Sequence, residues 1–164
     1  MPRTILNIIF GLFFICFLIN CERDDICLET TFGSPNFIIL LLDLENNKTR
    51  KNPAGFLIRA IGSDNVLTPY FNDSIVLPLN TKEKISQFEF ILNFGNENEN
   101  IDTLQINYKR IDKYINRACG YRSNFILEQS PATLLNPGDD WIKGFIILKD
   151  TISDETTAHL GILH

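Results

Sequence analysis

The sequence is poor in the residues and motifs on which common enzyme chemistry depends. It contains 2 histidines, 1 tryptophan and 1 methionine, and it lacks the CxxC, HExxH, GxSxG, GxGxxG and GxxxxGK motifs. These absences exclude the usual signatures of redox and zinc sites, serine hydrolases, and dinucleotide and nucleoside triphosphate binding. We therefore expect a non-enzymatic protein without a cofactor or a metal ion.

The sequence also has fewer basic than acidic residues. Lys and Arg total 15 against 20 Asp and Glu, giving a formal net charge of -5. Nucleic-acid binding needs clustered positive charge, so nucleic acid is not an expected partner. The chain is 45% hydrophobic and 21% charged, which is typical of a folded globular protein and excludes wholesale disorder.

A long apolar run occurs only at the N-terminus. Arg3 and the terminal amine precede Ile5–Ile19, which is apolar apart from Asn7. This is the pattern of a secretory signal, and we predict that residues 1–20 are removed. A permanent membrane span is the alternative, but about 15 residues make a helix of ~22 Å, short of the ~30 Å hydrocarbon core.

The end of this run resembles a bacterial lipobox. The resemblance lies in Phe17–Cys21 and implies a lipid on Cys21, although Asn20 replaces the usual Gly, Ala or Ser. Residues 21–35 would then be a lipidated tether and residues 36–164 the folded domain. Buried acyl chains contribute about 0.8 kcal/mol per CH₂, so two or three chains anchor a protein firmly.

The residues after Cys21 resemble the surface-export signal of Bacteroidetes lipoproteins, in which a basic residue and acidic residues follow the lipidated cysteine. Those residues are Glu22, Arg23, Asp24 and Asp25. The resemblance implies attachment to the outer membrane, facing outward. The alternatives are a generic charged tether and a protein that faces the periplasm.

Two cysteines remain free to pair after removal of the predicted signal peptide and lipidation of the mature N-terminus. Cys16 lies in the leader and Cys21 carries the lipid, which leaves Cys27 and Cys119 in an oxidising compartment. We predict a Cys27–Cys119 disulfide, worth about 4.5 kcal/mol through its loop of roughly 90 residues. A catalytic Cys119 would need a histidine partner, and both histidines lie near the end of the chain.

Short apolar and alternating runs dominate the rest of the sequence and predict β-strands. Leu104, Ile106 and Tyr108 share one face of such a run. The predicted strands are Phe37–Leu44, Gly55–Ile61, Val66–Leu67, Ser74–Leu79, Phe88–Phe94, Leu104–Tyr108, Ala118–Leu127, Gly144–Lys149 and His159–Leu163. Ile111–Asn116 and Pro131–Asn136 are candidates for short helical turns. The number of runs predicts an all-β protein with a single β-sandwich, immunoglobulin-like or transthyretin-like, behind the signal peptide.

Several short segments resemble a family of uncharacterised Bacteroidetes lipoproteins. They are Asp25–Cys27, Leu77–Asn80, Tyr108–Ile111 and Arg117–Tyr121. The resemblance implies an envelope location and one domain, but it implies no activity. As structural residues, Cys119 would be bonded, Gly120 would permit an unusual backbone angle, and Tyr121 would pack with its hydroxyl at an edge.

Two segments with several oxygen-bearing side chains are candidates for metal binding or catalysis. Asn96, Asn98, Asn100 and Asp102 present oxygens suited to Ca²⁺, but Ile101 and Asn107 occupy the positions where an EF-hand needs Gly and Glu. A hydrated hairpin is therefore favoured. Asp139 and Asp140 precede Trp141, but neighbouring strand residues point to opposite faces and cannot flank a glycosidic bond. We expect a turn there, with Trp141 opening a strand.

Three sites resemble the O-glycosylation motif of the Bacteroidetes, Asp followed by Ser or Thr and an apolar residue. They place the modification on Ser74, Thr103 and Thr151, and ordinary strand sequence is the alternative. His159 and His164 have no metal-binding spacing and are expected in a solvated tail.

These expectations define a lipid-anchored envelope protein that contacts the membrane through its anchor and binds or supports a protein or glycan partner. The alternatives are a hydrolase of envelope glycan or peptide, and a structural or assembly factor of the envelope.

Overall fold

The structure is a computed structural model that describes residues 26–28, 31, 33–63, 65–67 and 74–164. The predicted signal peptide, Cys21 and the export signal at residues 22–25 lie outside the described residues. Within the described ranges, no helix is long and apolar enough to cross a bilayer.

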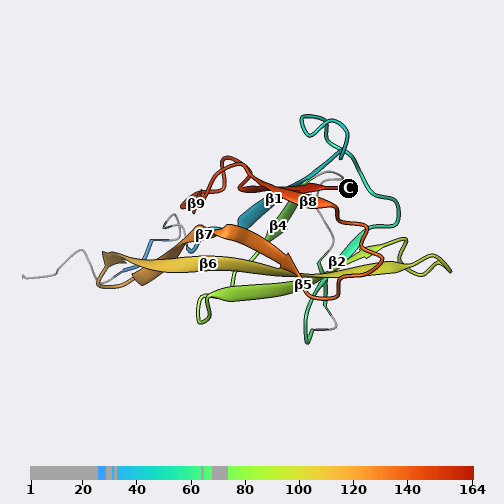
Figure 1. The fold of residues 1–164 in the computed structure, drawn as a ribbon. Helices are drawn as coiled ribbons and strands as arrows, with labels where there is room; N and C mark the ends of the chain where they lie inside the picture. The colour runs from blue at the N-terminus through green and yellow to red at the C-terminus, as the bar shows by residue number, and fades with distance from the viewer. Residues whose placement is uncertain (1–25, 29–30, 32, 64, 68–73) are drawn as a thin grey trace, which may run out of the picture. The chain divides into compact units, whose positions relative to one another are not determined.

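The described residues form strands and connecting turns, with no helix among them (Figure 1). The strands are β1 (Phe37–Leu42), β2 (Leu57–Ala60), β3 (Val66–Leu67), β4 (Ser74–Leu77), β5 (Ile85–Leu92), β6 (Asn100–Asn116), β7 (Gly120–Leu134), β8 (Gly144–Ile147), β9 (Thr151–Ile152) and β10 (Leu160–Leu163). They make a four-stranded sheet ordered β4-β1-β10-β8 and a six-stranded sheet ordered β3-β2-β5-β6-β7-β9. The protein is an all-β sandwich, as predicted.

The smaller sheet joins residues from both ends of the described chain. β1 lies between β4, which is antiparallel to it, and β10, which is parallel to it with Ile39 opposite Leu160. Phe37, Ile39 and Leu41 are each 0% exposed. Burial of each side chain contributes about 1.5–3 kcal/mol, so this strand is a main stabilising element.

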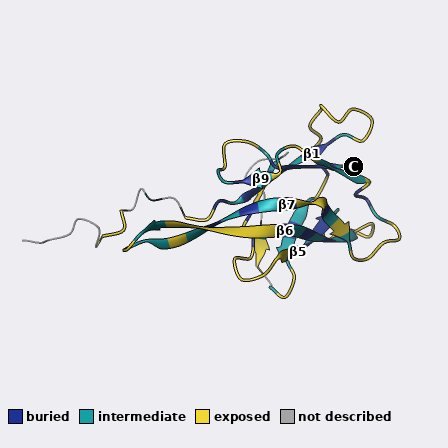
Figure 2. Ribbon diagram, turned by 60° about the vertical axis from the view of Figure 1, so that its left-hand side comes forward, coloured by how far each residue is buried: buried dark blue, intermediate teal, exposed yellow. Residues whose placement is uncertain are grey.

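The larger sheet supplies the other half of the core. On β6, Leu104, Ile106 and Tyr108 are fully buried, as their alternating pattern predicts. They belong to one hydrophobic cluster with the buried side chains of β1 and β10, so the cluster holds the two sheets together. Figure 2 shows the buried and exposed residues along the strands.

Gly55 fixes the end of β5. Asn93 follows β5 with a positive φ of 53°, and its backbone N–H donates to the Ala54 carbonyl. A Cβ on Gly55, which itself has a φ of +54°, would lie 3.0 Å from the Asn93 Cα. The alternating pattern therefore stops before Phe94, which is 50% exposed instead of sharing the buried face of Phe88 and Phe90.

Three local predictions are wrong. Ile111–Asn116 is the last part of β6 and not a helical turn. The helical turn predicted at Pro131–Asn136 is also wrong, because the strand β7 runs from Gly120 through Pro131 to Leu134. Trp141 lies in a bend before β8 rather than opening a strand. Because β6 and β7 are neighbours in the sheet, each satisfies backbone groups of the other, and this outweighs a weak local helical tendency at the first two sites.

The chain divides into two compact units. One comprises residues 1–31 and 114–121, and the other comprises residues 32–113 and 122–164. The Cys27–Cys119 disulfide belongs to the first unit, together with the end of β6 and the start of β7, and the other strands belong to the second.

Candidate functional site

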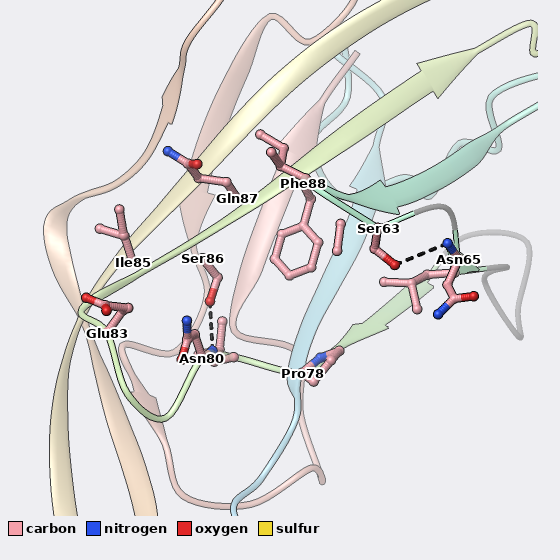
Figure 3. A pocket seen from close by; sticks show the side chains of 13 residues that line it. Ser63, Asn65, Pro78, Asn80, Glu83, Ile85, Ser86, Gln87 and Phe88 are labelled. Atoms are coloured by element: carbon pink, nitrogen blue, oxygen red, sulfur yellow. Dashed lines mark hydrogen bonds between the residues drawn. The ribbon is translucent and has the colours of Figure 1, made fainter.

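A cavity of about 570 Å³ opens beside the first half of β5, where β2 has already ended (Figure 3). The two strands pair from Leu57 opposite Ile91 to Ala60 opposite Phe88, whereas β5 extends back to Ile85. The turn at Gly62, which has a φ of +79°, ends β2 at this point. We call this hollow the β5 cavity.

The walls of the β5 cavity combine apolar side chains with hydroxyl and amide groups. The apolar residues are Ala60, Ile61, Leu67, Pro78, Leu79, Ile85 and Phe88, and the polar residues are Ser63, Asn65, Asn80, Glu83, Ser86 and Gln87. Glu83 is the one ionisable side chain among these described residues. Such a lining offers hydrogen bonds and apolar contact to a neutral polar ligand such as a sugar or a peptide.

A buried tyrosine fixes the polar wall of the β5 cavity. The Tyr108 hydroxyl lies 2.7 Å from Ser86 Oγ and 2.9 Å and 3.0 Å from the carbonyl oxygens of Asn80 and Ile85. The Asn80 N–H donates to Ser86 Oγ at 2.8 Å, as Figure 3 shows. Burial raises the pKa of Tyr108, so its hydroxyl stays neutral and acts as a positioning group.

The sequence placed Tyr108 in the core but did not reveal this network. A tyrosine in a row of buried positions needs a hydrogen-bond partner, and that requirement was the available signal. The partners lie 22 and 28 residues away along the chain, so their identity depends on the pairing of β5 with β6.

A second cavity of about 440 Å³ is lined by Gly33, Ser34, Pro35, Arg122 and residues 153–156. Its carboxylates are already engaged. Lys149 donates to Asp154 at 2.8 Å, and this bond holds the pKa of Asp154 far below its usual range. Asn36 donates to Glu155 Oε1 through its backbone N–H and its amide. These hydrogen bonds tie both acids into the loop at residues 153–156.

His159 is buried, so the expectation of a solvated tail is wrong for this residue. It is 0% exposed, its Nδ1 accepts from the Ile38 N–H at 3.0 Å, and its ring stacks on Phe37 with centroids 5.9 Å apart. Burial lowers the pKa of His159, which keeps the ring neutral. The parallel pairing of β10 with β1 draws this part of the chain into the sandwich.

The C-terminal His164 also has partners. Its Nε2 lies 3.1 Å from the Lys51 carbonyl oxygen, and its ring meets Trp141 edge-on with centroids 5.5 Å apart. It is half-buried rather than part of a free tail.

The predicted Cys27–Cys119 disulfide is present, and Gly120 has the predicted unusual angle with a φ of +68°. Tyr121 is 70% exposed, and its ring meets the ring of Tyr114 edge-on with centroids 5.3 Å apart.

The candidate glycosylation sites lie on three different strands. Ser74, Thr103 and Thr151 are half-buried on β4, β6 and β9. The apolar residue that follows each of them is a core residue: Ile75, Leu104 and Ile152 are each 0–1% exposed. Strand alternation therefore accounts for the apolar position of the motif without a modification.

The oxygen-bearing residues that were candidates for Ca²⁺ do not converge. Asp102 is 1% exposed and accepts from the Ile142 N–H at 2.7 Å, whereas Asn96 and Asn98 are exposed in the turn before β6. Within the described parts of the chain, no group of three His, Cys, Asp or Glu side chains could hold a metal ion.

The acidic pair beside Trp141 lies in the bend between β7 and β8. Asp140 Oδ2 accepts from the Gly138 N–H at 3.4 Å. Burial, together with the charge of Asp140, raises the pKa of Asp102. Sequence reasoning missed this approach of Asp140 to Asp102, but Asp102 is too buried to meet a substrate.

No curated protein and no solved structure matches the chain. Residues 56–164, about two thirds of the sequence, match the family of unknown function DUF6452. The matched segment includes the whole lining of the β5 cavity and every strand from β2 onward. The chain therefore belongs to DUF6452, a family of unknown function.

Proposed function

We propose that this protein is a non-enzymatic lipoprotein of the bacterial envelope that binds a protein or glycan partner in the β5 cavity. Cys21 carries the lipid, and the protein is held on the outer membrane of a member of the Bacteroidetes, facing outward. The support for the anchor is the resemblance of Phe17–Cys21 to a lipobox and the charged residues that follow it. The disulfide fits a protein exported to an oxidising compartment.

The observation that carries the binding proposal is the composition of the β5 cavity. Serine, asparagine and glutamine side chains alternate with Ile61, Ile85 and Phe88 around a hollow of about 570 Å³. Binding sites for small or extended ligands are concave and mostly apolar, with a few polar groups that set orientation. Among the residues that the structure describes, the lining has a single carboxylate and no histidine or cysteine, which favours binding over acid–base or nucleophilic catalysis.

Two substitutions with similar exposure separate binding in the cavity from general surface effects. Ile61 lines the cavity and is 46% exposed, whereas Val76 on β4 is 44% exposed and does not line it. The purified protein is tested for binding to immobilised envelope glycans and envelope proteins. We expect Ile61→Glu to weaken binding roughly tenfold because it places a charge in the cavity, and Val76→Glu to bind as the wild type does.

Equal binding by both variants and the wild type would place the partner elsewhere. The anchor is tested separately by mass spectrometry of the N-terminal peptide from the native host. A peptide that begins at acylated Cys21 is expected, and one that retains Met1 contradicts the proposal.

A further inference from the structure

Exposed apolar side chains lie close in sequence to the disulfide cysteines of the smaller compact unit. Ile26 and Leu28, on either side of Cys27, are 72% and 65% exposed. Tyr114 and Tyr121, from the ends of β6 and β7 that meet near Cys119, are 54% and 70% exposed. The tyrosine rings contact each other, and the disulfide joins the segment that holds Ile26 and Leu28 to the segment that holds Tyr121. We call these four side chains the disulfide patch.

The chemistry of the disulfide patch suits the boundary between lipid and water. Tyrosine combines an apolar ring with a polar hydroxyl and is enriched at the headgroup level of membranes. Isolated exposed apolar residues are common on proteins, but four around one covalent bridge mark a contact surface.

The disulfide also shortens the connection to the proposed anchor. Cys21 precedes Cys27 by six residues and Phe37, where β1 begins, by sixteen. At 3.3–3.6 Å per residue these segments span at most about 20 Å and about 55 Å. Cys27 therefore remains within about 20 Å of the lipidated cysteine. The closed bridge holds the Cα of Cys119 4.9 Å from that of Cys27, so the segment that holds Tyr121 stays near the anchor as well.

We infer that the disulfide patch rests in the headgroup region of the same bilayer that holds the lipid on Cys21, as a second contact with the membrane. This inference rests on the proposed lipid anchor and adds the surface that the protein lays against the membrane. A lipid anchor alone leaves a protein free to tumble on its tether, whereas two contacts limit its orientation.

The test uses the lipidated protein in vesicles of phosphatidylethanolamine and phosphatidylglycerol, with and without bromine on the acyl chains. Tyr121→Trp places a fluorescent reporter in the patch at a position that is 70% exposed, so the fold does not depend on it. The parent protein gives the signal of Trp141, which is 8% exposed, for subtraction. We expect the reporter emission to be about twofold lower in brominated vesicles, as for an aromatic ring at the interface.

A matched variant carries Cys27→Ser and Cys119→Ser together with Tyr121→Trp. Opening the bridge releases Tyr114 and the reporter at position 121 from the six-residue tether, so we expect most of the quenching to disappear. If this variant does not fold, the quenching of Tyr121→Trp with the bridge intact still decides the question.

The anchor and the patch fail in different ways. Protein that floats with vesicles and has an acylated N-terminal peptide, but whose reporter is not quenched, overturns the inference and leaves the anchor standing. Protein without an acylated peptide overturns both. A reporter that shifts only when protein concentration rises, without quenching, assigns the patch to a second copy of the chain and also overturns the inference.

Discussion

Acid should destabilise the sandwich through His159. The ring is fully buried against Phe37, and its Nδ1 accepts from the Ile38 N–H, so protonation would break that hydrogen bond and bury a charge. Burial, with the nearby positive charge of Lys149, lowers the pKa of His159 in the folded protein. In the unfolded chain the ring returns to its usual pKa of about 6.5.

The sign of the effect follows from proton binding. Below about pH 6.5 the unfolded chain binds a proton that the folded protein does not bind, so the free energy of unfolding falls as the pH falls. This contribution of His159 to the free energy of unfolding is fully present above about pH 6.5. It is lost progressively as the pH falls toward the pKa of the ring in the folded protein. While the folded ring stays neutral, unfolded-state protonation removes about 1.4 kcal/mol between about pH 7.5 and about pH 5.5.

The assay is urea unfolding followed by Trp141 fluorescence across this pH range, for the wild type and for His159→Gln. Glutamine retains an oxygen that can accept from Ile38 but does not titrate. The variant is expected to be less stable by about 1–3 kcal/mol at neutral pH through lost packing, and to lack the additional acid loss. Parallel curves of unfolding free energy against pH for the two proteins would refute the reasoning.

Three further predictions concern the disulfide, the β5 cavity and the buried acid. Replacing Cys27 and Cys119 by serine should lower the free energy of unfolding by about 4.6 kcal/mol, from a sequence separation of 92 residues; urea curves that do not shift would contradict this. Tyr108→Phe removes the hydroxyl that contacts Ser86 and should cost about 1–3 kcal/mol in the same assay; the network has no structural role if the loss is negligible. The raised pKa of Asp102 means that the folded protein holds this proton to a higher pH than the unfolded chain does. Unfolding free energy of the wild type should therefore fall relative to Asp102→Asn as the pH rises above about 3.9, and a constant difference across that range would contradict the assignment.

The local sequence pattern determined the strands. Alternation of apolar and polar residues identified β5 and β6, because successive strand residues face opposite sides and one side meets the core. The same rule buries Tyr108 and Leu104. The disulfide followed from the number of cysteines that the predicted signal peptide and lipidation leave, since Cys27 and Cys119 have one possible pairing between them.

Tertiary structure decided which strands became neighbours, and this determined the environment of the polar residues. His159 is near the end of the chain, and no local pattern indicates that β10 lies between β1 and β8. Ile111–Asn116 forms part of a strand instead of the expected helical turn because a partner strand supplies the backbone hydrogen bonds.

The β5 cavity depends on strand lengths that do not match. Pairing of β2 with β5 stops at Ala60, while β5 continues to Ile85, and the gap lies between residues far apart in sequence. Side-chain periodicity is a property of a single strand and is visible in the sequence. Register and strand order arise only when two sheets bury their apolar faces together, so the core was predictable and the cavity was not.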